Sequence, residues 1–278
     1  MRLGRRTADG GAMTTTESIT TENITHVHTA EAATPPGAGR RTALAGCAFL
    51  TCALPLVFGT TITGMLLTGV DSDHRFHQTT GQGLILVAFW LGAVVPLLRA
   101  GWRGERPSTA AGLRHLTLVV AGAGCAVAAP GGGAPGLVGV IAVGGALLWC
   151  ALPRRPRLRS AVQVDALLLP AALVLGAALL PYAADQLALQ NDATGYHSRN
   201  PHFFDMAWIS VVLVSQALMA ALLPAARRLA LPVAAATAAL GAAGLAFGED
   251  VTSSWVAVAL GIVLAAAGLV GARRPLGA

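Results

Sequence analysis

The chain has few charged residues and no lysine, and this scarcity limits what kind of protein it can be. Only 12% of its 278 residues are charged and 54% are hydrophobic, whereas about a quarter of the residues of an average soluble domain are charged. The mean hydropathy is +0.63. These values exclude an ordinary soluble fold. The absence of lysine, beside abundant alanine and glycine, is typical of a GC-rich bacterial genome and bears on origin alone.

Cysteine is also scarce, and its placement excludes a disulfide framework. Cys47, Cys52, Cys125 and Cys150 all lie in apolar stretches, and none belongs to a CxxC pair. Oxidation would require cysteines in exposed outer loops. We therefore interpret all four as small apolar packing residues.

The net charge of +6 and the isoelectric point near 10.1 come from arginines in short, separated clusters. A nucleic-acid surface would gather these charges on one face. We therefore expect no nucleic-acid partner. The expected environment is the lipid bilayer, with a homo-oligomer or a membrane-complex partner left open.

Eight apolar blocks predict an all-α integral membrane protein with eight transmembrane helices. Each block has about the length, 17–25 residues, that crosses roughly 30 Å of hydrocarbon at 1.5 Å per residue. The blocks are 42–68, 81–98, 113–129, 136–152, 161–182, 203–223, 229–247 and 255–271. The third and fourth could instead form a re-entrant pair, which would leave six full spans.

The same pattern divides the chain into three parts. Residues 1–41 are polar and are expected to form a disordered cytoplasmic tail, with Met13 as a second candidate start. Residues 42–272 form the predicted transmembrane domain, and residues 273–278 a short cytoplasmic tail. The eight helices also divide into two similar sets of four, which leaves a parallel duplication open.

Arginine placement predicts the orientation, because basic residues in short loops stay in the cytoplasm. Alternate loops contain Arg40 and Arg41; Arg99, Arg103, Arg106 and Arg114; Arg154, Arg155, Arg157 and Arg159; Arg227 and Arg228; and Arg273 and Arg274. The intervening loops contain only Arg75 and Arg199. Both termini are therefore expected in the cytoplasm of a bacterial cell, with the protein in the plasma membrane. Trp90 is unusual because it is expected near the middle of the bilayer.

Polar residues converge on the predicted outer side, in two connections. They are Asp71, Asp73, His74 and His77 in the first connection, and His197, His202 and Asp205 in and after the connection between the fifth and sixth helices. The pairs His74/His77 and His202/Asp205 have i,i+3 spacing, which puts each pair on one helix face. Imidazoles and carboxylates suit a transition metal, and two facing imidazoles suit haem b. Solvated loop and helix-capping residues are the alternative interpretation.

This layout resembles the haem A synthase family: eight spans in two sets of four, with His77 and His202 opening the second helix of each set. The resemblance covers this layout alone. In that family, histidines also lie on the fourth and eighth helices, and many members have an outer cysteine pair. This chain has neither feature, so the family's ligand sets are incomplete here.

Charged groups within the apolar blocks are rare, and ion-coupled transporters usually need one. Asp165 in the fifth block and Gln216 in the sixth are the candidate transport relay, although Asp165 could simply pair with Arg157 or Arg159. Pro55 and Pro170 are expected to kink the first and fifth helices.

Three functions remain open. The sequence favours a metal- or haem-binding accessory or electron-transfer protein over a small-molecule permease or exporter. A structural or interaction protein without a ligand is the third.

Overall fold

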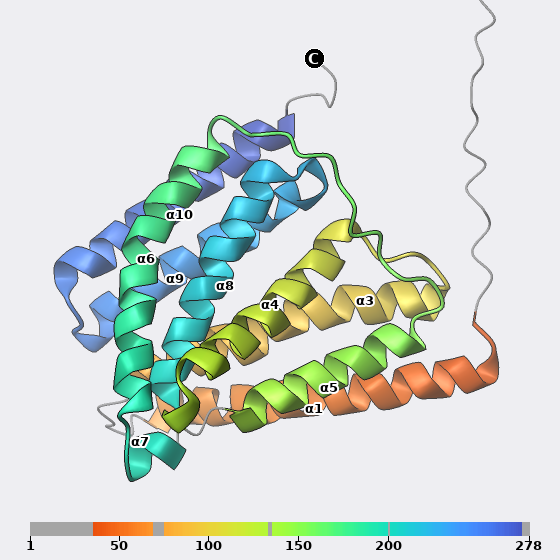
Figure 1. Cartoon of the computed structure of the whole chain (residues 1–278), viewed down its shortest axis with the longest axis horizontal. Helices are drawn as coiled ribbons and strands as arrows, with labels where there is room; N and C mark the ends of the chain where they lie inside the picture. Colours follow the sequence, from red (N-terminus) through yellow and green to blue (C-terminus); the bar gives the residue numbers. More distant parts are fainter. Residues whose placement is uncertain (1–35, 69–74, 133–134, 200, 274–278) are drawn as a thin grey trace, which may run out of the picture. The chain divides into compact units, whose positions relative to one another are not determined.

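The computed structural model describes residues 36–68, 75–132, 135–199 and 201–273 (Figure 1). Of these residues, 85% are helical and none lies in a strand. The helices, in chain order, are α1 (Ala38–Thr68), α2 (Arg75–His77), the π-helix η1 (Gln78–Trp90), α3 (Leu91–Arg103), α4 (Thr109–Ala128), the 3₁₀ helix η2 (Pro130–Gly132), α5 (Pro135–Ala151), α6 (Leu168–Asn191), α7 (Tyr196–Arg199), α8 (His202–Leu222), the 3₁₀ helix η3 (Pro224–Leu229), α9 (Ala230–Phe247) and α10 (Val251–Arg273).

Seven helical segments in the described residues are long and apolar enough to cross a membrane, which indicates a polytopic helical membrane protein. They are Ala38–Gly64, Arg75–Arg103, Thr109–Ala128, Leu168–Asn191, His202–Leu222, Pro224–Phe247 and Val251–Gly271. The second of them joins α2, η1 and α3 into one run of 29 residues. The fourth expected span is the apolar helix α5, whose 17 residues make it shorter than these seven.

Helices that are close in sequence also pack together. α9 packs along α10, and α6 packs along α8 (Figure 1). α1 contacts η1 and α5, while α4 contacts α3, α5 and α8. α8 is the most enclosed span, with 72% of its apolar window buried, so its polar side chains need partners from other helices.

Local signals end and restart the helices at their connections. α3 and α9 end at Gly104 and Gly248, which have φ angles of 71° and 76°, a left-handed conformation that glycine adopts without a Cβ penalty. Ser108 then accepts a hydrogen bond from the backbone of Ala111 at the start of α4. Asp250 similarly caps α10.

Trp90 is buried, and its position follows from the proline in α1. Pro55 has no N–H, so the carbonyl of Thr51, four residues earlier, lacks its helical donor. The Trp90 indole Nε1 donates to this carbonyl at 2.6 Å. A buried tryptophan therefore supplies the hydrogen bond that proline removes.

The fifth helix differs from the prediction at its start. Residues 161–165 are not helical, and α6 begins only at Leu168. The backbone amides of Gln163 and Asp165 donate to the carbonyls of Leu222 and Ala221, at 2.9 and 2.8 Å. These carbonyls belong to the last turn of α8, which has no helical donors of its own. An extended segment therefore satisfies the end of α8.

The expected kink at Pro170 is wrong for the same reason. Since α6 starts at Leu168, Pro170 lies in its first turn, where a missing N–H costs no helical hydrogen bond. The proline inside α6 is Pro181, and the one inside α1 is Pro55, as expected. α1 also begins before the expected boundary, because Arg40 and Arg41 are helical.

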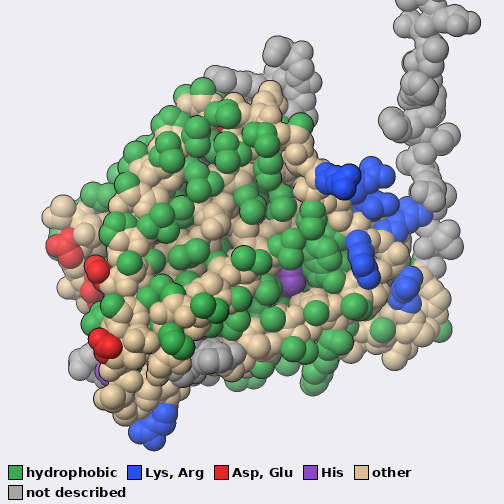
Figure 2. Space-filling view, viewed as in Figure 1, with side chains coloured by type: hydrophobic (Ala, Val, Ile, Leu, Met, Phe, Trp, Pro, Cys, Tyr) green, Lys and Arg blue, Asp and Glu red, His purple; other side chains and the backbone are tan. Residues whose placement is uncertain are grey.

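Charged side chains lie at the ends of the helices on the face drawn in Figure 2, and a smaller basic patch lies at α7, close to the acidic side chains at the lower end of α6. Basic side chains gather near the ends of α3 and α5 and the connection that leads to α6, whereas acidic side chains lie around the α9–α10 connection and the lower end of α6. Exposed arginines at the first location are Arg103, Arg106, Arg155, Arg157 and Arg159. Exposed acids at the second are Asp185, Asp192, Glu249 and Asp250.

Candidate functional site

Three imidazoles meet where α2, α7 and α8 come together. His77 ends α2, His197 lies on α7 and His202 opens α8. The ring centroids of His77 and His202 are 5.5 Å apart, and those of His197 and His202 are 4.9 Å apart. The imidazole cluster, as we name these three side chains, thus joins two connections that are far apart in the sequence.

Neighbouring side chains position the cluster. Gln190, which has no exposed surface, donates from Nε2 to the carbonyl of His197 at 3.1 Å, and its Oε1 accepts from the amide of Phe204 at 3.1 Å. One buried amide therefore ties α7 and the first turn of α8 to the end of α6. The Phe203 ring stacks on His197 with centroids 5.1 Å apart and contacts His77 edge-on at 5.6 Å.

His197 and His202 are joined by a hydrogen bond between their rings. Nδ1 of His197 lies 3.0 Å from Nε2 of His202, a distance that requires an N–H on one nitrogen and a lone pair on the other. His202 is 1% exposed, whereas His197 is partly exposed. The hydrogen bond therefore joins a partly exposed imidazole to a buried one.

Asp205 lies one helical turn below His202 and is completely buried. In the part of the chain that is described, neither carboxyl oxygen has a hydrogen-bond partner. Gln82 of η1 is close enough to interact with the carboxyl, but outside hydrogen-bond geometry. An ionised carboxylate without a partner costs several kcal/mol in such a place, which makes aspartate an expensive residue at this position.

Gly81 allows η1 to approach Asp205. A Cβ at position 81 would lie 3.0 Å from the Cβ of Asp205 and 3.3 Å from the sulfur of Met206. Real Cβ atoms almost never come closer than the first of these distances. Any larger residue at position 81 would therefore push η1 away from the carboxyl.

The remaining predicted ligands are not all placed. Asp71, Asp73 and His74 lie outside the described residues. Within the described residues, no group of three or more His, Cys, Asp or Glu side chains is arranged to hold a metal ion. A metal or haem site at this end of the bundle stays a prediction.

The two predicted relay residues have structural partners. Asp165 precedes α6, and its Oδ1 accepts from the amides of Leu167 and Leu168 at 3.0 and 3.1 Å. Its Oδ2 lies 3.4 Å from Nε of Arg227. The ion pair is therefore formed with Arg227 and not with Arg157 or Arg159. These contacts hold the start of α6 against η3.

Gln216 is buried in α8 and faces α4. Its Nε2 donates to Oγ1 of Thr117 at 3.1 Å. Trp208, also on α8, donates from Nε1 to the carbonyl of Leu118 at 2.8 Å. Both side chains thus fasten α8 to α4, and the transport role of Gln216 stays a prediction.

Sequence reasoning missed a second buried histidine. His115 is 3% exposed and lies between two indoles, with ring centroids 5.4 Å from Trp90 and 6.2 Å from Trp149. Trp149 donates from Nε1 to its Nδ1 at 3.2 Å, so the proton of His115 is on Nε2. Because these contacts join α4, η1 and α5, no local motif could have revealed them.

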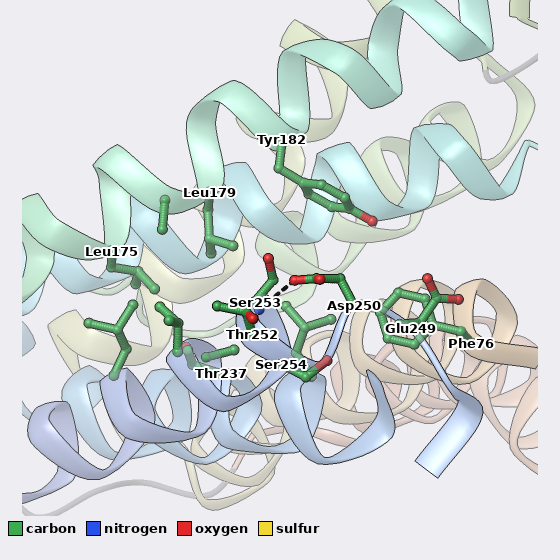
Figure 3. Close-up of a pocket in the computed structure, with 15 residues that line it drawn as sticks. Phe76, Leu175, Leu179, Tyr182, Thr237, Glu249, Asp250, Thr252, Ser253 and Ser254 are labelled. Carbon is green, nitrogen blue, oxygen red and sulfur yellow. Dashed lines mark hydrogen bonds between the residues drawn. The ribbon is translucent and has the colours of Figure 1, made fainter. Parts of the chain in front are cut away.

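A cavity of about 510 Å³ was also missed. It lies between α6, α9 and α10, with Phe76 of α2 on one side (Figure 3). The acids Glu249 and Asp250 line it. Comparison with known proteins assigns no function to the cavity or to the chain. No protein-family model matches the chain, and no curated protein or solved structure is significantly similar to the chain.

Proposed function

We propose that this chain is a proton-coupled membrane permease in which the imidazole cluster and Asp205 transfer the proton. The observation that carries the proposal is the carboxyl of Asp205: it is completely buried in a helix long enough to span a membrane, and its oxygens have no partner among the described residues. Ionisable residues at such positions are costly and typically serve ion pathways.

The imidazole cluster provides a route for the proton to this carboxyl. His197 is partly exposed and can exchange protons with water, and its hydrogen bond passes them to the buried His202. Histidine suits this role because its ordinary pKa is about 6.5. His202 and Asp205 then lie on one face of α8.

We further propose that the chain crosses the membrane eight times, with α5 as the short fourth span and both termini in the cytoplasm. The gathering of exposed arginines near the ends of α3 and α5 and the connection that leads to α6 supports this topology, with Arg199 of α7 as the exception. The imidazole cluster then faces outward, and the two sets of four helices form its halves. A reporter that is active only outside the cell, inserted at Asp192, should be active; activity of a cytoplasmic reporter there would reverse the orientation.

Proton movement can be measured without knowing the transported compound. Proteoliposomes loaded with the pH dye pyranine, under a potassium and valinomycin potential, should acidify faster than empty liposomes. Asp205→Asn should abolish the difference. Asp185→Asn, which removes an exposed acid of α6, should keep it. Equal acidification with wild-type protein and with Asp205→Asn would reject the proposal.

A transition-metal or haem b site is the second candidate, favoured by the three imidazoles within one cluster. Metal analysis and a visible spectrum of the purified protein test it. Stoichiometric metal or a Soret band should disappear with His202→Ala and persist with His28→Ala in the N-terminal segment. Protein that is colourless and free of metal would reject this candidate.

A further inference from the structure

The cavity between α6, α9 and α10 combines an apolar interior with an acidic edge. Leu175 and Leu179 of α6 and Leu240 of α9 supply apolar surface. Its volume, about 510 Å³, lies within the range of roughly 300–1,000 Å³ of small-molecule sites. The interior thus suits a compact apolar body the size of a drug-like molecule.

The acidic edge is formed by the connection between α9 and α10. Glu249 and Asp250 are both exposed and line the cavity. Asp250 accepts a hydrogen bond from the amide of Ser253 at 2.7 Å (Figure 3). This hydrogen bond lowers the pKa of Asp250, and the carboxylate is ionised at neutral pH, as an aspartate with the ordinary pKa near 4 would also be. No arginine or histidine is among the described residues that line the cavity, so the charged side chains of its lining are both acidic.

Two aromatic rings complete the edge. Tyr182 of α6 points toward the acidic connection, and Phe76 of α2 also lines the cavity (Figure 3). Aromatic faces attract cations, most strongly where water is excluded. Carboxylates, aromatic rings and an apolar interior together favour a positively charged compound with an apolar body over an anion or a neutral sugar.

We propose that this cavity binds a hydrophobic organic cation, a quaternary ammonium or phosphonium compound or a protonated amine, between α6, α9 and α10. The assignment rests on the proposed function in one respect: it names the class of compound that the permease would carry. Phe76 links the two sites, because it lines the cavity while the next residue, His77, belongs to the imidazole cluster.

Binding can be measured directly on the purified full-length chain in neutral detergent. Tetraphenylphosphonium is the probe, and tetraphenylborate, which has nearly the same shape and the opposite charge, is its control. Equilibrium dialysis should detect saturable binding of the cation and none of the anion. A double substitution Glu249→Gln/Asp250→Asn should weaken cation binding at least tenfold. Asparagine at position 250 can still accept the Ser253 hydrogen bond, so the helix cap is retained.

A matched control removes two other exposed acids. Asp185→Asn/Asp192→Asn changes the net charge equally and should leave binding unchanged. Leu179→Trp, which fills the cavity, should abolish binding without altering charge. Equal binding of the two probes, or no effect of Glu249→Gln/Asp250→Asn, would show only an apolar, lipid-filled groove and overturn the proposal.

The outcome separates this inference from the proposed function. Asp205→Asn should stop proton movement while leaving tetraphenylphosphonium binding intact. Binding without any Asp205-dependent proton flux would retain the cation site and reject proton coupling. Asp205-dependent proton flux without cation binding would retain proton coupling and reject the cation site.

Discussion

Replacing Trp90 by phenylalanine should destabilise the folded bundle, and restoring a backbone donor at position 55 should cancel most of that loss. Trp90 donates to the carbonyl of Thr51 at 2.6 Å, and Pro55 is the reason that this carbonyl has no helical donor. Phenylalanine keeps most of the ring but removes the N–H. The Thr51 carbonyl would then be buried without a donor.

The size of the effect follows from the cost of an unpaired buried acceptor, about 1–3 kcal/mol. Trp90→Phe in the natural background should therefore lower the free energy of unfolding by about 2 kcal/mol, plus a smaller packing loss. In a Pro55→Ala background, the new amide at position 55 can bond to Thr51. Only the packing loss should remain there, so the coupling between positions 55 and 90 should reach about 1–2 kcal/mol.

Unfolding by sodium dodecyl sulfate in mixed micelles, followed by tryptophan fluorescence or circular dichroism, measures all four proteins of this double-mutant cycle. Trp102→Phe is the matched control, because the Trp102 side chain is 51% exposed and should cost little in either background. An equal loss from Trp90→Phe with proline and with alanine at position 55 would refute the hydrogen-bond explanation.

Three further predictions follow from contacts elsewhere in the bundle. Gly145→Ala should destabilise the protein by about 1–3 kcal/mol, because the new methyl group would collide with the His115 ring; thermal unfolding in detergent measures this. Arg227→Ala should cost about 3 kcal/mol in the same assay, because it leaves the buried Asp165 carboxylate without its ion pair. The hydrogen bond that lowers the Asp250 pKa stabilises the fold above the ordinary pKa near 4. This stabilisation is lost as the pH falls through the lowered pKa of Asp250. The free energies of unfolding of wild type and Asp250→Asn, measured in detergent, should therefore converge in acid.

Each of these predictions has a control in the same region. Gly139→Ala, at a site on α5 with open space around it, should be nearly neutral, and a loss equal to that of Gly145→Ala would remove the steric explanation. Arg157→Ala should also be neutral, because Arg157 is exposed. A larger cost than for Arg227→Ala would contradict the assigned ion pair. If the difference in stability between wild type and Asp250→Asn widened in acid, the ionised Asp250 carboxylate would not be the form that stabilises the fold.

The sequence was sufficient for helices whose ends are marked by local signals. The expected block 229–247 corresponds to α9 at Ala230–Phe247, which ends at Gly248. The block 161–182 was wrong only at its start, because its first residues bond to the carbonyls of Leu222 and Ala221 in a helix that follows it in the chain, and the helix begins at Leu168. Apolar composition cannot distinguish such an extended segment from the first turns of a helix.

Only part of the candidate site could be predicted from the sequence. The i,i+3 spacing puts His202 and Asp205 on one face of a helix, but the sequence does not reveal what faces them. The approach of His197 depends on Gln190, and the approach of η1 to Asp205 depends on Gly81. Both are contacts between separate elements, so they become visible only when the helices are packed.

Among the charged side chains buried against the bundle, Asp205 differs from the others in the described residues. Arg114 is charged but donates to the carbonyls of Gly92 and Ala88, at 3.3 Å each, and lies over the Phe89 ring. Asp165 has backbone donors and an arginine. A fold that provides partners for these two charges could have provided one for Asp205, or replaced it with an apolar residue at a gain in stability. Asp205→Asn or Asp205→Leu should therefore unfold at a higher temperature than wild type while losing proton movement, whereas a loss of stability in both variants would assign Asp205 to structure.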